Sequence, residues 1–233
     1  MHEDPTTSPG NGAYTAERPQ SAQAEAYQFL LQAIRTGRLP AGRHVSADSV
    51  AEQLAISRIP VREAIQRLAS EGLMTLRSNR GAIVTTLSGD EVIELYEMRS
   101  VLEGLAMRFV AIAIDARGLA EARLLLNRLD QSRSDVDWFI AAHNDFHDQL
   151  MHYCRRRRLV REVTRIRTAT EPYLRLTLRM SPTAFANTTD EHAILLTVVE
   201  RKNPDLADTA MRSHILATDI LNLLPSVAGA LAE

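Results

Sequence analysis

Apolar side chains recur at helical spacing soon after residue 20. Four of them fit one face of a first helix: Tyr27, Leu30, Leu31 and Ile34. Gly37 follows and supplies the stop, because glycine readily adopts the left-handed conformation in which helices often end. Ser46 then suits the N-cap of a short second helix that runs through Leu54, and a turn follows it.

A third helix is predicted directly after this turn. Ser57 is its expected N-cap, and Pro60 is tolerated because it lies in the first helical turn. The apolar stripe of this helix consists of Val61, Ala64, Ile65 and Leu68. Arg58 and Arg62 lie off this stripe. Serine and arginine are residue types that hydrogen-bond phosphates and base edges, so the pattern makes DNA binding the leading hypothesis.

Two short strands are predicted after the third helix, at residues 73–76 and 82–86. The segment between them, residues 78–81, reads as a hairpin tip that carries Arg80. Three helices followed by a two-stranded ribbon indicate a winged helix-turn-helix. The sequence Ser88-Gly89-Asp90 is the expected domain boundary.

The rest of the chain has helical periodicity almost to its end. The predicted helices cover residues 92–114, 119–129, 137–153, 159–179, 190–201 and 206–224, and Pro172 is expected to kink the fourth of them. We therefore expect a mainly α protein whose second domain is an antiparallel bundle of six or seven helices. The predicted organisation is a disordered tail at 1–20, a winged helix-turn-helix domain at 21–88 and a helical domain at 89–233.

The overall charge of −2 hides an asymmetry along the chain. Residues 21–88 carry eight arginines and five acidic residues, so the basic excess lies where the DNA-binding pattern lies. The N-terminus has no secretion signal pattern, no apolar run reaches the length of a membrane span, and Cys154 is the only cysteine. These features predict a cytoplasmic protein that is not attached to a membrane.

Four of the seven histidines form a pattern that suits a metal site. His143 and His147 share one helical face at i, i+4, while His192 and His214 lie on the last two predicted helices. Inward faces of a helical bundle can converge on one cation, and neutral imidazole binds transition metals at pH 7. Zn is the favoured ion, with Ni, Cu, Mn and Fe as alternatives.

The chain resembles the GntR type of bacterial transcription regulators. Residues 26–86 are similar to their DNA-binding domain, most clearly in the segment SRIPVREAIQRLASEGL that starts at Ser57. Residues 90–224 resemble the helical effector domain called FCD, which is found in the FadR-like branch. The matching segments are ELYEMRSVLEGLAMR, DFHDQL, EHAILLTVVERKNPDLA and AMRSHIL.

This resemblance implies how the first domain meets DNA. The recognition helix would lie in the major groove, with Arg58 and Arg62 facing the bases and Ser57 near a phosphate. Arg80 at the tip of the wing would reach the backbone or the minor groove. Such proteins bind short palindromic operators as dimers, so a homodimer is expected.

The resemblance also implies a metal site with one departure from the family pattern. Metal-binding FCD domains use one aspartate and three histidines, the first two ligands within the motif D-x-x-F-H. Here Phe146, His147, His192 and His214 match, whereas His143 occupies the aspartate position. Either His143 is a ligand in a neutral four-histidine site, or it points away and three histidines bind the metal together with water or an anion.

FCD domains typically bind a small carboxylate effector beside the metal. Arg99 could clamp such a carboxylate, or it could pair with Glu103 one turn later. The resulting hypothesis is a ligand-responsive regulator, usually a repressor, and not an enzyme. Two alternatives are a metal-dependent helical enzyme, which leaves the DNA-binding pattern unexplained, and an architectural DNA-binding protein without a ligand.

Overall fold

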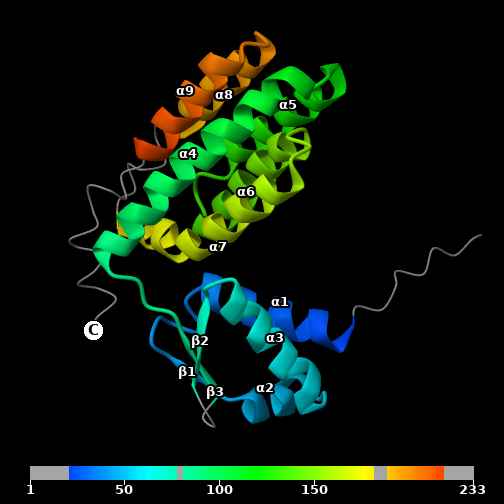
Figure 1. Ribbon diagram of the computed structural model, residues 1–233, viewed down its shortest axis with the longest axis vertical. Coiled ribbons are helices and arrows are strands. Elements are labelled where there is room, and N and C mark those ends of the chain that lie inside the picture. The colour runs from blue at the N-terminus through cyan, green and yellow to red at the C-terminus, as the bar shows by residue number, and fades with distance from the viewer. Residues whose placement is uncertain (1–20, 78–80, 181–187, 218–233) are drawn as a thin grey trace, which may run out of the picture.

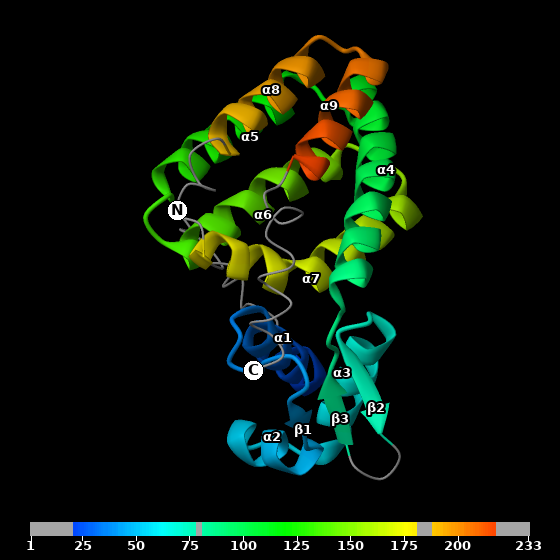
Figure 2. The same cartoon turned by 90° about the vertical axis from the view of Figure 1, so that its left-hand side faces the viewer.

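The computed structural model describes residues 21–77, 81–180 and 188–217. Within these residues the chain forms a small N-terminal unit of helices and strands and a larger unit built of helices (Figure 1). Figure 2 shows that the segment after the last strand leads directly into the first helix of the larger unit. The expected tail at 1–20 and Arg80 in the expected hairpin tip lie outside the described residues.

The N-terminal unit is a winged helix-turn-helix. Its helices are α1 (Ala22–Arg35), α2 (Ala47–Leu54) and α3 (Arg58–Ser70), and its strands are β1 (His44–Val45), β2 (Met74–Arg77) and β3 (Gly81–Val84). The strands pair antiparallel in the order β1-β3-β2. The prediction of a two-stranded ribbon was therefore incomplete. Strand β1 is two residues long and is defined by its pairing with β3, which no local pattern reveals.

The core of this unit follows the predicted apolar positions. The stripe of α3 is fully or almost fully buried against α1, and Leu30 of α1 is also buried. Ala55 adopts a left-handed conformation that turns the chain sharply from α2 into α3. Ser57 occupies the N-cap position of α3, but its side chain makes no capping hydrogen bond, so the predicted cap is correct in position only. Its hydroxyl is exposed to solvent.

The larger unit contains six helices in the described residues. They are α4 (Gly89–Ala113), α5 (Ala116–Gln131), α6 (Val136–His152), α7 (Arg157–Met180), α8 (Thr188–Glu200) and α9 (Pro204–Leu216). Pro172 lies inside α7. The last helix ends at Leu216 with Ala217 as its C-cap, and residues 218–224 of its expected extent lie outside the described part.

Close packing of α4 and α9 sets the position of the candidate site. Gly104 makes this approach possible, because a Cβ atom at this position would collide with the side chain of Asp208. The apolar core around α4 includes Met107, Val110 and Met211, all fully buried. None of the described helices is long and apolar enough to cross a membrane.

Direct contacts join the two units. Arg35 at the end of α1 donates from Nε to Oε1 of Glu171 on α7 at 2.7 Å. The Tyr173 hydroxyl accepts a hydrogen bond from the backbone N–H of Leu87 at 2.9 Å. Ala169 of α7 also packs against the core of the N-terminal unit. Helix α7 is thus the part of the bundle that faces the N-terminal unit (Figure 1).

Candidate functional site

The exposed face of α3 carries the side chains that the sequence predicts for DNA contact. Arg58, Arg62 and Gln66 are spaced at one helical turn and all are exposed. Ile59 is 70% exposed on the same first turn, although it is a large apolar residue. Apolar contacts to the thymine methyl group are a known part of base readout, so Ile59 joins this face. Its position beside Arg58 and Arg62 could have revealed it in the sequence.

The arginines near α3 differ in how they are held. Arg58 pairs with Asp48 of α2, with Nε and Oδ1 3.0 Å apart, and both side chains are exposed. Arg67 pairs with Glu71 at 3.0 Å and stacks on the Tyr27 ring, so it holds α3 and α1 together. Burial and the hydrogen bond from its hydroxyl to Glu71 raise the pKa of Tyr27 to about 12.

The second candidate site is a cluster of four histidines inside the bundle. His143 and His147 come from α6, His192 from α8 and His214 from α9. One ring nitrogen from each lies within 4.8 Å of the others. None of the four residues is more than 9% exposed. The structure therefore brings together all four predicted ligands, including His143, from three helices.

Burial gives these rings the electronic state that a metal requires. The pKa of His143 and of His147 is well below its ordinary value, because burial disfavours the imidazolium form and neighbouring cationic groups repel a further proton. Both rings are therefore neutral at pH 7. A neutral imidazole presents one nitrogen lone pair, which is the donor that Zn and similar ions bind.

The hydrogen-bonding pattern of the cluster fits a bound cation. The Nε2 atoms of His147 and His192 face each other at 3.1 Å. Two nitrogens bound to one ion at ~2.1 Å would lie roughly 3–3.4 Å apart, so this separation suits neighbouring ligands. The Nδ1 atoms of His143 and His147 are buried and have no hydrogen-bond partner within the described residues. These four donors thus form a set that could hold a transition metal.

Two carboxylates lie next to the histidines, and one of them is within hydrogen-bond distance of a ring. His214 Nδ1 lies 3.0 Å from Glu191 Oε2, which leaves the Nε2 atom of this ring for a metal. Glu103 of α4 is completely buried, and its Oε2 lies 3.9 Å from the Nδ1 atom of His147. Neither role was assigned from the sequence. The i, i+4 spacing predicted Glu103 only as a possible ion-pair partner of Arg99, and not as a neighbour of the histidines.

A small cavity adjoins the cluster on the side of His143. Its lining residues are Arg99, His143, Asn144, Arg167, Thr170, Glu171 and Leu174. Arg99 pairs with Glu103 at 2.8 Å and also contacts the Thr170 hydroxyl. Of the two roles considered for Arg99, the pairing with Glu103 is observed, and the guanidinium still borders the cavity. Arg167 was not predicted here, since nothing in its local sequence distinguishes it from the other arginines of α7.

Three acidic residues that could act as the base of a hydrolytic metal enzyme lie against basic side chains. Asp145 points to the surface and pairs with Arg128 at 2.9 Å. Asp148 pairs with Arg167 at 2.7 Å. Glu191 faces the ring of His214. All three carboxylates are thus within reach of a basic side chain.

Comparison with known proteins identifies both units. The profile of the gntR family of bacterial regulatory proteins matches residues 22–84, and the FCD domain profile matches residues 94–217. A probable D-xylose utilization operon transcriptional repressor of Paenarthrobacter nicotinovorans is 30% identical over 81% of this chain and 83% of its own. The transcriptional repressor GlaR of Escherichia coli is 26% identical over 88% of this chain and 97% of its own.

Solved structures share the same fold. The structure of E. coli McbR/YncC superposes with a TM-score of 0.75 at 21% identity, over 91% of this chain and 99% of the other. The order of a winged helix-turn-helix followed by a helical bundle is therefore common to both proteins. The chain belongs to the GntR family of DNA-binding transcription regulators and carries an FCD domain.

Proposed function

We propose that this regulator controls transcription through a small carboxylate that binds beside a divalent metal in the helical bundle. The observation that carries the proposal is the buried four-histidine cluster next to a cavity bordered by Arg99 and Arg167. A transition metal with an open coordination position would attract the carboxylate, and the arginines would hold its oxygens. The histidines need no catalytic role in this function.

Zn is the favoured metal because all four donors are imidazole nitrogens. The family pattern has an aspartate where this chain has His143, so a bound ion here would keep its full double positive charge. That charge would strengthen the attraction of an anionic effector. Nitrogen donors also favour Zn, Ni and Cu over ions that prefer oxygen ligands, such as Mg and Ca.

A polar chain links this cavity to the DNA-binding unit. Asn144 borders the cavity and donates to Oε2 of Glu171 at 3.1 Å, while Arg167 donates to Oδ1 of Asn144 at 3.0 Å. The other oxygen of Glu171 accepts from Arg35 of α1. An effector that changes the partners of Asn144 or Arg167 would therefore act on the contact that ties α1 to the bundle. Effector binding would then shift the population of unit arrangements that fit DNA.

DNA recognition is assigned to the exposed face of α3. Arg62 is the favoured base-reading residue, Arg58 and Ser57 would contact bases or phosphates nearby, and Ile59 would contact a thymine methyl group. Arg80 is proposed for the wing contact on sequence grounds alone, since it lies outside the described residues. The relatives named as repressors support repression as the mode of action.

A homodimer would present two copies of α3 to a palindromic operator. One face of α4 supplies a candidate interface, because four apolar side chains line it at helical spacing: Met98, Val101, Leu105 and Ile112. Each of them is at least 40% exposed in the single chain. Arg108, which pairs with Asp205, lies between Leu105 and Ile112 on this face. An exposed apolar stripe on a bundle surface is a typical protein-interaction site.

A thermal-shift screen of small mono- and dicarboxylates tests the proposed control. The screen uses the full chain with added Zn and, in parallel, with a chelator. A ligand that binds only the folded state adds about 2.7 kcal/mol to the free energy of unfolding when its concentration is a hundred times its Kd. The melting temperature rises as a result. We expect carboxylates that stabilise the protein only when Zn is present. If the chelator leaves the stabilisation unchanged, effector binding does not require the metal.

A further inference from the structure

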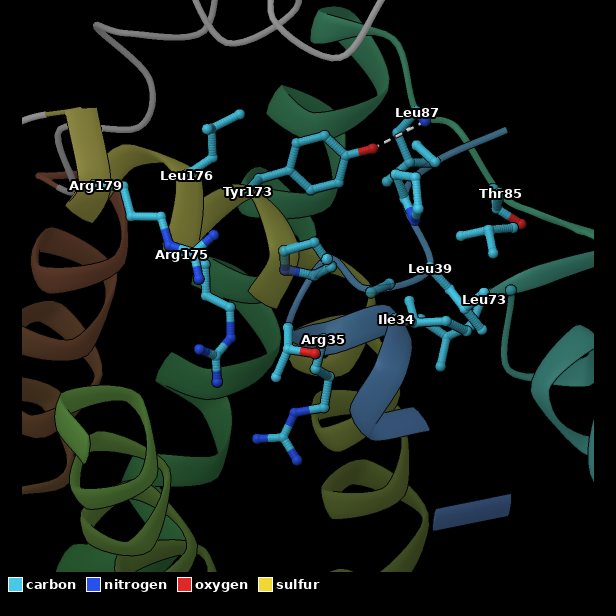
Figure 3. Close-up of a pocket in the computed structure, with 18 residues that line it drawn as sticks. Ile34, Arg35, Leu39, Leu73, Thr85, Leu87, Tyr173, Arg175, Leu176 and Arg179 are labelled. Carbon is cyan, nitrogen blue, oxygen red and sulfur yellow. Dashed lines mark hydrogen bonds between the residues drawn. The ribbon is translucent and has the colours of Figure 1, made fainter. Parts of the chain in front are cut away.

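A second cavity lies between the two units, on the opposite side of α7 from the histidine cluster. Its walls come from the end of α1 and the turn after it, from the two residues before β2, from the end of β3 and the segment after it, and from α7. Figure 3 shows Ile34, Leu39 and Leu73 on one side and side chains of α7 on the other. No lining residue is shared with the cavity beside the histidines. The two cavities are therefore separate sites.

The lining of this cavity is mostly apolar. The apolar groups include Ile34, Leu39, Leu73, Val84, Leu87, Ala169, Pro172 and Leu176. Concave apolar surfaces at the junction of two domains are frequent ligand sites, because a ligand there removes apolar area of both domains from water. The hydroxyl of Tyr173 closes one side, where it accepts the hydrogen bond from the Leu87 N–H (Figure 3).

The charges around the cavity leave one uncompensated cation. Arg35 and Arg175 both pair with Glu171, and Arg175 also pairs with Asp137. Arg179 lies one turn further along α7, is exposed, and has no ion pair among the described residues. The cavity thus combines an apolar interior with an available guanidinium at its rim, which fits a ligand with an apolar body and one negative end.

We propose that this interdomain cavity binds an amphipathic monocarboxylate, with the carboxylate on Arg179 and the hydrocarbon part between α7 and the turn after α1. Such a ligand contacts both units at once, so it favours the arrangement in which the units are packed as observed. The site would be a second regulatory input, separate from the metal-linked effector site. It does not depend on metal binding, because its lining contains none of the four histidines.

Octanoate titrated into the full-length chain in the presence of a chelator tests this proposal. The readout is methyl NMR of selectively labelled leucine and valine, with Leu39, Leu73 and Val84 as reporters in the cavity wall. Leu174 reports on the cavity beside the histidines. Leu129 lines neither cavity and belongs to the core cluster against which Leu174 packs. We expect saturable shifts at the first three residues and none at Leu129.

The charge is tested by a matched pair of variants and a matched pair of ligands. Arg179→Gln should raise the Kd for octanoate about tenfold, since a charge-assisted hydrogen bond is lost. Arg201→Gln removes an exposed arginine in the turn directly after α8 and should leave the Kd unchanged. Octanamide has the same chain without the charge and should bind about tenfold more weakly than octanoate.

Three results would overturn the proposal. The first is the absence of octanoate binding at millimolar concentration. The second is binding that shifts Leu174 while Leu39, Leu73 and Val84 stay unchanged, which would place the ligand beside the histidines. The third is an equal affinity of the Arg179→Gln variant and the unmodified chain. Because the chelator is present throughout, none of these outcomes depends on the metal-linked function.

Discussion

At the residue scale, the same side-chain type has different roles in different surroundings. Arg62 is exposed and has no ion pair among the described residues, whereas Arg67, five positions later, stacks on Tyr27 and pairs with Glu71. Arg99 is buried and compensated by Glu103. Arg67 is exposed as well, so its pairing, and not its exposure, distinguishes it from Arg62.

Replacing Arg62 with alanine should weaken binding to an operator selected from a random DNA pool by roughly 1–3 kcal/mol, because a bidentate contact to a base is lost. Binding to unrelated DNA should change little, since phosphate contacts from other cations remain. Fluorescence anisotropy at a fixed salt concentration measures both affinities. Arg161→Ala, an exposed arginine on the bundle, is the control. Equal operator affinity of the Arg62 variant would contradict the assignment of the recognition face.

Replacing Glu191 with glutamine should weaken Zn binding by roughly 10–100-fold, although Glu191 is not itself a proposed ligand. The physical reason is that its carboxylate orients His214 and makes that ring a stronger donor. Competition with a chromophoric chelator measures the affinity. Glu94→Gln, on an exposed position of α4, should bind Zn as the unmodified chain does. An unchanged affinity in the Glu191 variant would mean that this carboxylate does not support the site.

At the element scale, α4 connects the parts of the molecule. It begins directly after the N-terminal unit, carries Arg99 and Glu103 beside the candidate metal site, and packs on α9 at Gly104. Its first turn is held by a capping box, in which the Ser88 hydroxyl accepts from the Glu91 N–H and the Glu91 carboxylate accepts from the Ser88 N–H. The start of α4 is thus fixed by local interactions.

Replacing Ser88 with alanine should lower the free energy of unfolding by ~1 kcal/mol through loss of the N-cap. Urea unfolding followed by circular dichroism measures the change, and Ser88→Thr is the control that keeps a capping hydroxyl. The backbone N–H of Ser88 holds the pKa of Glu91 below its ordinary value of 4.5. The stabilising effect of the Glu91 carboxylate is therefore present above this pH and lost as the pH falls through the lowered pKa. A Ser88→Ala variant as stable as the unmodified chain would contradict the capping role.

At the scale of the whole molecule, α7 separates the two cavities and also faces the DNA-binding unit. One side of the helix borders the cavity beside the histidines, and the other borders the cavity between the units. Glu171 of this helix pairs with Arg35 of α1. Any ligand that moves α7 will therefore change the junction between the bundle and the N-terminal unit, which is the physical basis of the regulation proposed above.

The apolar stripe of α4 predicts the oligomeric state. Leu105→Glu should convert a dimer into a monomer, because a charge in the centre of an apolar interface is left without a partner. Light scattering at micromolar concentration measures the mass. Leu124→Glu introduces the same charge at a residue that is 70% exposed on α5 and should leave the mass unchanged. A monomeric unmodified chain would contradict the proposed homodimer, and a dimeric Leu105 variant would move the interface away from this stripe.

The sequence predicted most of the architecture but only part of the candidate site. Local patterns were sufficient for the helices, since helical spacing and capping residues act within a few positions. Strand β1 was missed, because two residues carry no periodicity and become a strand only through pairing with β3. Glu103 and Arg167 were not assigned to the site, since their roles depend on helices that are distant in the sequence.

The sequence by itself determined the order of a winged helix-turn-helix and a helical domain, the exposed arginines of α3 and the four histidines, because residue type and spacing define each of these features. Tertiary structure alone decided that the four histidines meet and that Glu191 and Glu103 lie next to them. It also decided that a cavity with Arg179 at its rim lies between the two units. These features depend on packing between helices, and packing is a property of the whole folded chain.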